Sequence, residues 1–92
     1  MIKSFKHKGL SKFFESGSMA GIQARHVRKL QLILTRLDAS ICVEDMDLPG
    51  LHLHKLKGTL NKFHSVIVQA NWRVIFQFEG SNAFNVDYID YH

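Results

Sequence analysis

The chain has 92 residues, a length that supports one domain with one hydrophobic core and is too short for two. Hydrophobic residues make up 46% of it and proline occurs once, which excludes a disordered chain. The single cysteine excludes an intrachain disulfide. The chain also lacks a run of about 18 apolar residues, the length that a membrane-spanning helix needs. We therefore expect one cytoplasmic domain, residues 1–92.

The formal net charge of +4 is unevenly distributed along the chain. Residues 1–36 hold eight lysines or arginines against Glu15 alone, a net +7. Residues 37–50 hold four acids and no base, a net −4, and the remainder holds four bases and three acids, a net +1. Such a basic surface can attract nucleic acid or an acidic protein partner, or do no more than solvate a helical face.

The first 40 residues predict a short strand followed by two helices. Residues 2–5 alternate weakly, as a short strand would. Leu10, Phe13 and Phe14 recur at the spacing of a short amphipathic helix, which Gly17 would end. A longer helix is predicted from about residue 22 to residue 39, because apolar side chains recur on one face: Val27, Leu30, Ile33, Leu34 and Leu37.

Residues 40–52 predict a loop, because they break the helical period, carry several acids and include the turn signal Pro49-Gly50. Cys42 lies in this loop. Since the sequence identifies no base that could activate its thiol, we interpret Cys42 as a small, half-buried apolar side chain rather than a nucleophile.

After this loop the hydrophobic period changes from 3.6 to 2, which predicts strands at 64–69, 72–79 and 83–90 and a short extended segment at 54–56. Ala70-Asn71 and residues 80–82 fit hairpin turns, because Asn and Gly tolerate positive φ. The prediction is an α+β fold with both helices on one face of an antiparallel sheet. The side chains expected under the long helix are Trp72, Val74, Phe76, Phe78, Phe84, Val86 and Tyr88.

The opposite face of the strand at 72–79 carries Arg73, Ile75 and Gln77. We expect this face to be open to solvent, which leaves Arg73 free to meet a ligand.

Six histidines in a chain of this length raise the question of a metal site. His52 and His54 have a spacing that ligands use, but the chain lacks a cysteine cluster and the HExxH helical pair. The sequence therefore predicts no metal site. His26 and His64 are interpreted as ordinary polar positions.

A second constellation of cations and titratable groups is spread over three segments: His54, Lys57, Arg73, Asp90, Tyr91 and His92. If the segment at 53–58 enters the sheet near the end where the last strand leaves it, these side chains meet on one open surface. RNA cleavage needs such a set: a base for the 2′-OH, an acid for the 5′-oxygen and cations for the phosphate. That reaction needs no metal or other cofactor. A terminal Asp-Tyr-His can equally be a solvated end.

The stretches "LHKLKG" at 53–58, "SVIVQANWRVIFQF" at 65–78 and "VDYIDYH" at 86–92, after a start of "MIKSFKHKGL", closely resemble the HigB toxins of bacterial type II toxin–antitoxin modules. These toxins belong to the RelE/ParE superfamily. The resemblance covers essentially the whole chain and is weakest at 18–50. It implies a single RelE/ParE-like domain, with helices against a twisted antiparallel sheet.

The resemblance also implies a function, that of a ribosome-dependent endoribonuclease that cuts mRNA in the ribosomal A site and stops translation. The implied partners are the 70S ribosome with its mRNA and a HigA-type helix-turn-helix antitoxin, with operator DNA bound only through the antitoxin complex. No membrane partner is implied. Family active-site positions fall on His54, Asp90, Tyr91 and His92, with Lys57 and Arg73 as phosphate and RNA contacts.

The chain departs from many relatives at Thr59, Leu60, Asn61, His64 and Gln69, so its affinity for RNA or the ribosome can differ. Two other classes of function stay open. One is a non-catalytic toxin of the gyrase-inhibiting ParE-like branch, which lacks the Asp-Tyr-His set. The other is a small basic RNA-binding module without catalysis.

Overall fold

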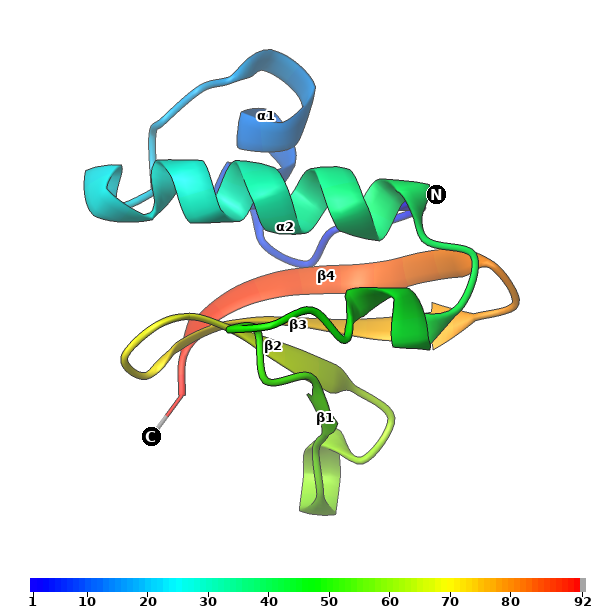
Figure 1. Ribbon diagram of the computed structural model, residues 1–92. Coiled ribbons are helices and arrows are strands. Elements are labelled where there is room, and N and C mark those ends of the chain that lie inside the picture. The colour runs from blue at the N-terminus through cyan, green and yellow to red at the C-terminus, as the bar shows by residue number, and fades with distance from the viewer. Residues whose placement is uncertain (92) are drawn as a thin grey trace.

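The computed structural model describes residues 1–91 and places two helices on one face of a four-stranded antiparallel sheet (Figure 1). The helices are α1 (Lys8–Ser16) and α2 (Val27–Ala39). The strands lie side by side in chain order: β1 (His54–Lys55), β2 (His64–Gln69), β3 (Trp72–Glu79) and β4 (Asn82–Asp90). Three short 3-10 turns connect them: η1 (Ala24–His26), η2 (Val43–Met46) and η3 (Gly58–Leu60). The predicted α+β class is confirmed.

Helix α1 ends where the sequence predicts. Gly17 takes a left-handed conformation with φ 77°, and its N–H donates to the Phe13 carbonyl. Leu10 and Phe13 are buried, as the helical spacing predicts. Phe14 is 37% exposed and packs beside Phe5, with 5.7 Å between ring centroids.

The N-terminal segment and the start of α2 differ from prediction. Ile2 and Phe5 form only isolated parallel bridges to β4, at Ala83 and Val86, so residues 2–5 do not make a regular strand. Helix α2 begins at Val27 rather than near residue 22, because η1 occupies the preceding turn. No helix within residues 1–91 is long and apolar enough to cross a bilayer.

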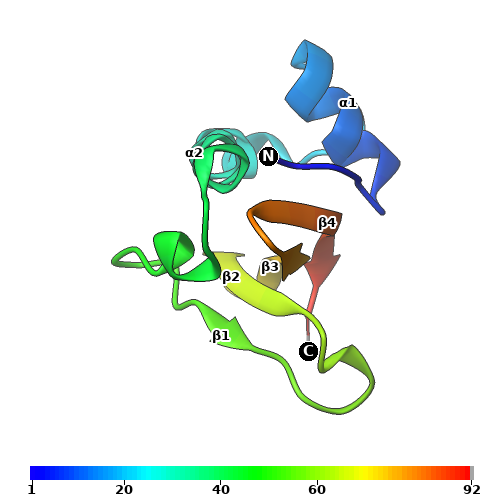
Figure 2. The same ribbon diagram turned by 90° about the vertical axis from the view of Figure 1, so that its right-hand side faces the viewer.

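The hydrophobic core lies between the helices and the sheet (Figure 2). Its most enclosed side chains are Leu10, Leu30, Ile33, Leu34, Leu37, Val66, Val74, Phe76 and Val86. Trp72 and Phe78 pack against this core from partly buried positions. The predicted core-facing sides of α2 and of the strands are therefore confirmed, apart from Phe84 on β4.

Phe84 is the exception, because β4 contains a bulge. Ile75 pairs with Asp87 but Gln77 pairs with Phe84, so two residues of β4 stand opposite one of β3. Asn85, in the bulge, has a φ of 53°. The extra residue reverses the alternation of side chains and places Phe84 on the face of the sheet away from the helices. The prediction that Phe84 packs under the long helix is wrong.

The second face of the sheet is not fully open to solvent. Ile75 is only 2% exposed, and its β2 neighbour Ser65 is also buried. The segment that carries β1 and η3 lies on this side of the sheet (Figure 2). The prediction of a solvent-exposed Ile75 is therefore wrong, whereas Arg73 and Gln77 are half-buried.

Candidate functional site

The β2–β3 turn and the end of β4 bring three predicted site residues together. Trp72 pairs with Asp90 across β3 and β4, so Arg73 is beside this pair. The Tyr91 N–H donates to the Asn71 carbonyl at 2.8 Å, which extends the pairing by one residue. Arg73, Asp90 and Tyr91 therefore lie at one end of two neighbouring strands.

The turn itself holds the Arg73 guanidinium. Its Nη1 donates to the Ala70 carbonyl at 2.6 Å and to the Trp72 carbonyl at 3.3 Å. Its Nε is buried and has no hydrogen-bond partner within residues 1–91. The turn therefore holds the Arg73 cation in one position, which suits contact with an anion such as a phosphate.

The left-handed residue of this turn is Ala70, with φ 52°. The sequence favours Asn71 for such a position, because asparagine tolerates positive φ better than alanine does. Ala70 is therefore a strained residue directly before the candidate site, and its carbonyl accepts the shorter of the two hydrogen bonds from Arg73 Nη1.

His54 lies on the same face of the sheet as Arg73, two strands away. It pairs with Ser65, which pairs with Ile75, and alternation along β3 puts Ile75 on the side of Arg73. Neighbouring strands are about 4.8 Å apart, so β1 lies about 10 Å from β3. Within the described residues, no hydrogen bond joins His54 or Lys57 directly to Arg73.

The contact of His54 with the backbone favours one tautomer of its ring. Nδ1 lies 3.3 Å from the His52 carbonyl oxygen, which can only accept, so Nδ1 carries the proton. In the neutral ring, Nε2 is then the basic nitrogen. His54 and Lys57 are both exposed, so each side chain can reach a bound strand.

The last predicted residues divide between the two faces. Asp90 follows Tyr88 by two positions, so strand alternation directs it to the side of the helices, while Tyr91 belongs to the face of Arg73. Tyr91 is 37% exposed. The predicted role of His92 concerns a residue outside the part of the chain that the structure describes.

His26 was predicted to be an ordinary polar position, but it is buried and hydrogen-bonded at both ring nitrogens. Nδ1 lies 2.6 Å from the Tyr88 hydroxyl and Nε2 lies 2.9 Å from Gln69 Oε1. Because an amide oxygen only accepts, Nε2 donates to Gln69 and Tyr88 donates to Nδ1. Burial raises the pKa of Tyr88, which keeps its hydroxyl proton in place.

This network joins His26, directly before α2, to Tyr88 on β4, two residues before Asp90. It is a positioning element that sequence reasoning missed. The residue that could have signalled it is Gln69, singled out by the resemblance, which here accepts from His26.

Two smaller predictions concern metals and cysteine. Within residues 1–91, no three histidine, cysteine or acidic side chains gather as a metal site would require. Cys42 is exposed rather than half-buried, so that prediction is wrong. Desolvation and the charge of Asp45 raise the pKa of its thiol, which disfavours the nucleophilic thiolate.

Comparison with known proteins places the chain in a family. A family model described as "RelE-like toxin of type II toxin-antitoxin system HigB" matches residues 3–92. A relative from Proteus vulgaris, named endoribonuclease HigB, is 40% identical over 92 residues, which is 100% of both chains.

Two solved structures from Helicobacter pylori share the fold. One is a copper-bound mutant toxin with a TM-score of 0.52, covering 98% of this chain and 94% of its own. The other is a conserved hypothetical protein with a TM-score of 0.50, covering 96% and 94%. Both are 16% identical to this chain, so they support its fold alone.

The family match implies an antitoxin partner, because each type II module pairs its toxin with an antitoxin. The chain belongs to the HigB-like family of RelE-like toxins of type II toxin–antitoxin systems, as the sequence resemblance predicted.

Proposed function

We propose that this toxin is an endoribonuclease that cleaves mRNA in the A site of translating 70S ribosomes and so stops translation. The observation that carries the proposal is the 40% identity, over the full length of both chains, to a protein named endoribonuclease. The grouping of Arg73, Asp90 and Tyr91 at one end of β3 and β4, with His54 on the face of Arg73, supports it.

In the proposed reaction, the ribose 2′-oxygen attacks the adjacent phosphorus and the bond to the 5′-oxygen breaks. His54 Nε2 takes the proton of the 2′-OH, because the other ring nitrogen is occupied by its donation to His52. His92, assigned from the resemblance, returns a proton to the 5′-oxygen. The products are a 2′,3′-cyclic phosphate and a 5′-OH end, and no metal takes part.

The remaining residues would bind and orient the strand. Arg73 would hold its guanidinium, fixed by the Ala70 carbonyl, against a phosphate oxygen, and Lys57 would add an exposed cation. Tyr91 positions a base or phosphate from the same face. Asp90 orients or charges a neighbouring group.

The test is mRNA cleavage on translating ribosomes by the variants His54→Ala and His92→Ala. Loss of one acid–base group costs about 10²–10⁴ in rate, so we expect each variant to slow cleavage by that factor and to lose toxicity. The matched control is His52→Asn, which removes a neighbouring exposed imidazole. Asparagine tolerates the φ of 50° at this position and keeps the carbonyl that His54 contacts.

Mapping the 5′ ends of cellular mRNA after induction gives the second readout. Wild-type cleavage rates in both histidine variants would contradict the mechanism. Gyrase-linked DNA breaks with intact mRNA would instead favour the ParE-like branch.

We propose that a HigA-type helix-turn-helix antitoxin neutralises this toxin in the cytoplasm and that operator DNA is bound only through their complex. The family match supports an antitoxin of some kind. Co-expression with the candidate antitoxin, followed by purification of the complex and an operator gel shift with and without the toxin, tests this partner.

A further inference from the structure

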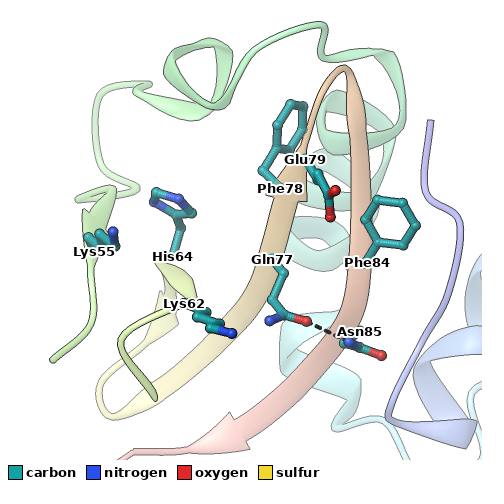
Figure 3. A pocket seen from close by; sticks show the side chains of 8 residues that line it. All are labelled: Lys55, Lys62, His64, Gln77, Phe78, Glu79, Phe84 and Asn85. Atoms are coloured by element: carbon teal, nitrogen blue, oxygen red, sulfur yellow. Dashed lines mark hydrogen bonds between the residues drawn. The ribbon is translucent and has the colours of Figure 1, made fainter. Parts of the chain in front are cut away.

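A polar groove lies at the Glu79 end of β3 (Figure 3). Asp90 pairs with Trp72 at the other end of this strand. The volume of the groove is about 470 Å³, within the range of roughly 300–1,000 Å³ that small-ligand sites occupy. Figure 3 shows Lys55, Lys62 and His64 on one side, and on the other Gln77, Asn85, Glu79 and the rings of Phe78 and Phe84. The side chains that matter are Lys55, Lys62, His64, Gln77, Phe84 and Asn85.

Only part of the groove lies on the face of the sheet that carries Arg73, namely Gln77 and its β4 partner Phe84. Lys55 pairs with His64 and His64 pairs with the core residue Phe76, so these two side chains belong to the opposite face. Alternation along β3 puts Gln77 on the side of Arg73. At about 3.3 Å per residue, the two positions are about 13 Å apart along the strand. A single RNA strand whose phosphate contacts Arg73 could therefore continue along β3 into the groove.

Phe84 gives the groove an aromatic surface that folding does not explain. The bulge at Asn85 turns its ring away from the helices, and it belongs neither to the hydrophobic core nor to the side chains packed against that core. A half-exposed ring in a polar groove is a stacking surface of the kind that single-stranded RNA-binding proteins offer to unstacked bases.

Gln77 and Asn85 form a fixed pair of amides beside this ring. Asn85 Nδ2 donates to Gln77 Oε1, and the Asn85 backbone N–H donates to Ser4 Oγ at 2.9 Å. Within the described residues, no hydrogen bond uses Gln77 Nε2 or Asn85 Oδ1. The pair therefore offers one donor group and one acceptor, the combination with which amides recognise a base edge.

The charge of the groove favours a phosphate. Lys55 and Lys62 line it against one carboxylate, that of Glu79. Burial, and next the charge of Lys55, lowers the pKa of His64, so its ring is neutral near pH 7. That ring stacks on Phe76, with 5.9 Å between centroids, and forms an apolar wall.

We propose that this groove is a subsite for one unstacked nucleotide of single-stranded RNA, with its phosphate at Lys55 and Lys62, its base on Phe84 and its base edge at the Gln77–Asn85 pair. The inference rests on the proposed function, which makes RNA the strand on this face. It adds a binding position distinct from the residues assigned to cleavage.

The first test is an NMR titration of the full chain with a 2′-O-methylated single-stranded RNA hexamer, which lacks the 2′-hydroxyl that cleavage requires. We expect the side-chain amide signals of Gln77 and Asn85 to shift. Phe84→Ala should weaken binding about tenfold, the scale of one lost base–aromatic stack. Phe84→Leu, which keeps apolar bulk without a ring, should weaken it as well.

Lys62→Ala tests the phosphate contact. Its matched control is Lys12→Ala on α1, because each variant removes one exposed lysine. Only Lys62→Ala should weaken binding and reduce its salt dependence. Both Phe84 variants should unfold at the wild-type temperature, since the ring lies outside the core. Unshifted amide signals, or wild-type affinity in folded Phe84→Leu, would overturn the proposal.

The second test asks whether the bound nucleotide belongs to mRNA or to ribosomal RNA. It compares cleavage rates of the wild type and Phe84→Ala on ribosomes whose mRNAs end at successive positions beyond the A-site codon. Slower cleavage by Phe84→Ala only on the longer mRNAs would assign the subsite to mRNA. Slower cleavage at every length would assign it to ribosomal RNA, and wild-type cleavage at every length would refute the subsite. Shifted groove signals in a toxin that cuts no mRNA would refute the proposed function alone.

Discussion

His26 shows how one buried side chain can set the position of a distant site. Its imidazole is 1% exposed and joins Gln69, at the end of β2, to Tyr88, near the end of β4. The ring also packs edge-on against Trp72, the partner of Asp90. One histidine thus ties together the strand ends that carry Asp90 and Tyr91.

We predict that His26→Ala lowers the free energy of unfolding by about 2–4 kcal/mol. The substitution leaves a cavity and removes the acceptor of the buried Tyr88 hydroxyl. Urea unfolding measures the change. The control is Gln31→Ala on the exposed side of α2, which should change stability by less than about 0.5 kcal/mol. A His26→Ala protein as stable as that control would contradict the network's role.

At the scale of elements, the two hairpins of the sheet use their turns differently. The β3–β4 connection places Gly80 at φ 62°, which glycine adopts without strain. The β2–β3 connection gives the same left-handed region to Ala70, next to a bulge between Ile67 and Gln69. The strained hairpin is the one that carries Arg73.

We predict that Ala70→Gly stabilises the protein by about 0.5–1 kcal/mol, because the left-handed conformation is strained for alanine and not for glycine. The Arg73 contact uses the backbone carbonyl, so it is retained. Ala39→Gly at the end of α2 is the matched control and should destabilise by a similar amount. Thermal unfolding of the two variants would show opposite shifts, and a loss of stability in Ala70→Gly would be the contrary result.

At the scale of the whole molecule, the sheet separates two roles. One face packs against the helices and forms the core. The other carries Arg73, His54 and, within the groove, Gln77 and Phe84. His54, Lys57 and Tyr91 lie on an open surface, so the orientation of an RNA strand must come largely from a larger partner.

We therefore predict that the purified toxin cleaves free mRNA far more slowly than mRNA on ribosomes, by at least about a hundredfold. The reason is that an unheld strand must lose its orientational freedom at the moment of reaction. Matched time courses with the same mRNA, free and ribosome-bound, measure the ratio. Efficient turnover of free mRNA would remove the proposed ribosome dependence.

The sequence by itself determined both helices, the three long strands and most of their core-facing sides, because these follow from local periodicity. The 3.6-residue pattern of α2 and the alternation of β3 each specify a buried side without knowledge of the partner. Gly17 ended α1 for an equally local reason. The family resemblance rested on contiguous stretches of sequence, and the match of the family model to residues 3–92 confirmed it.

Only the tertiary structure decided what depends on register between segments far apart in the chain. The bulge that turns Phe84 outward follows from the pairing of β3 with β4, and the burial of Ile75 from the segment folded over the sheet. The partners of His26 lie 43 and 62 residues away, a separation that no local pattern reports. Side-chain period is a property of one segment, whereas register and long-range hydrogen bonds are properties of the packed whole.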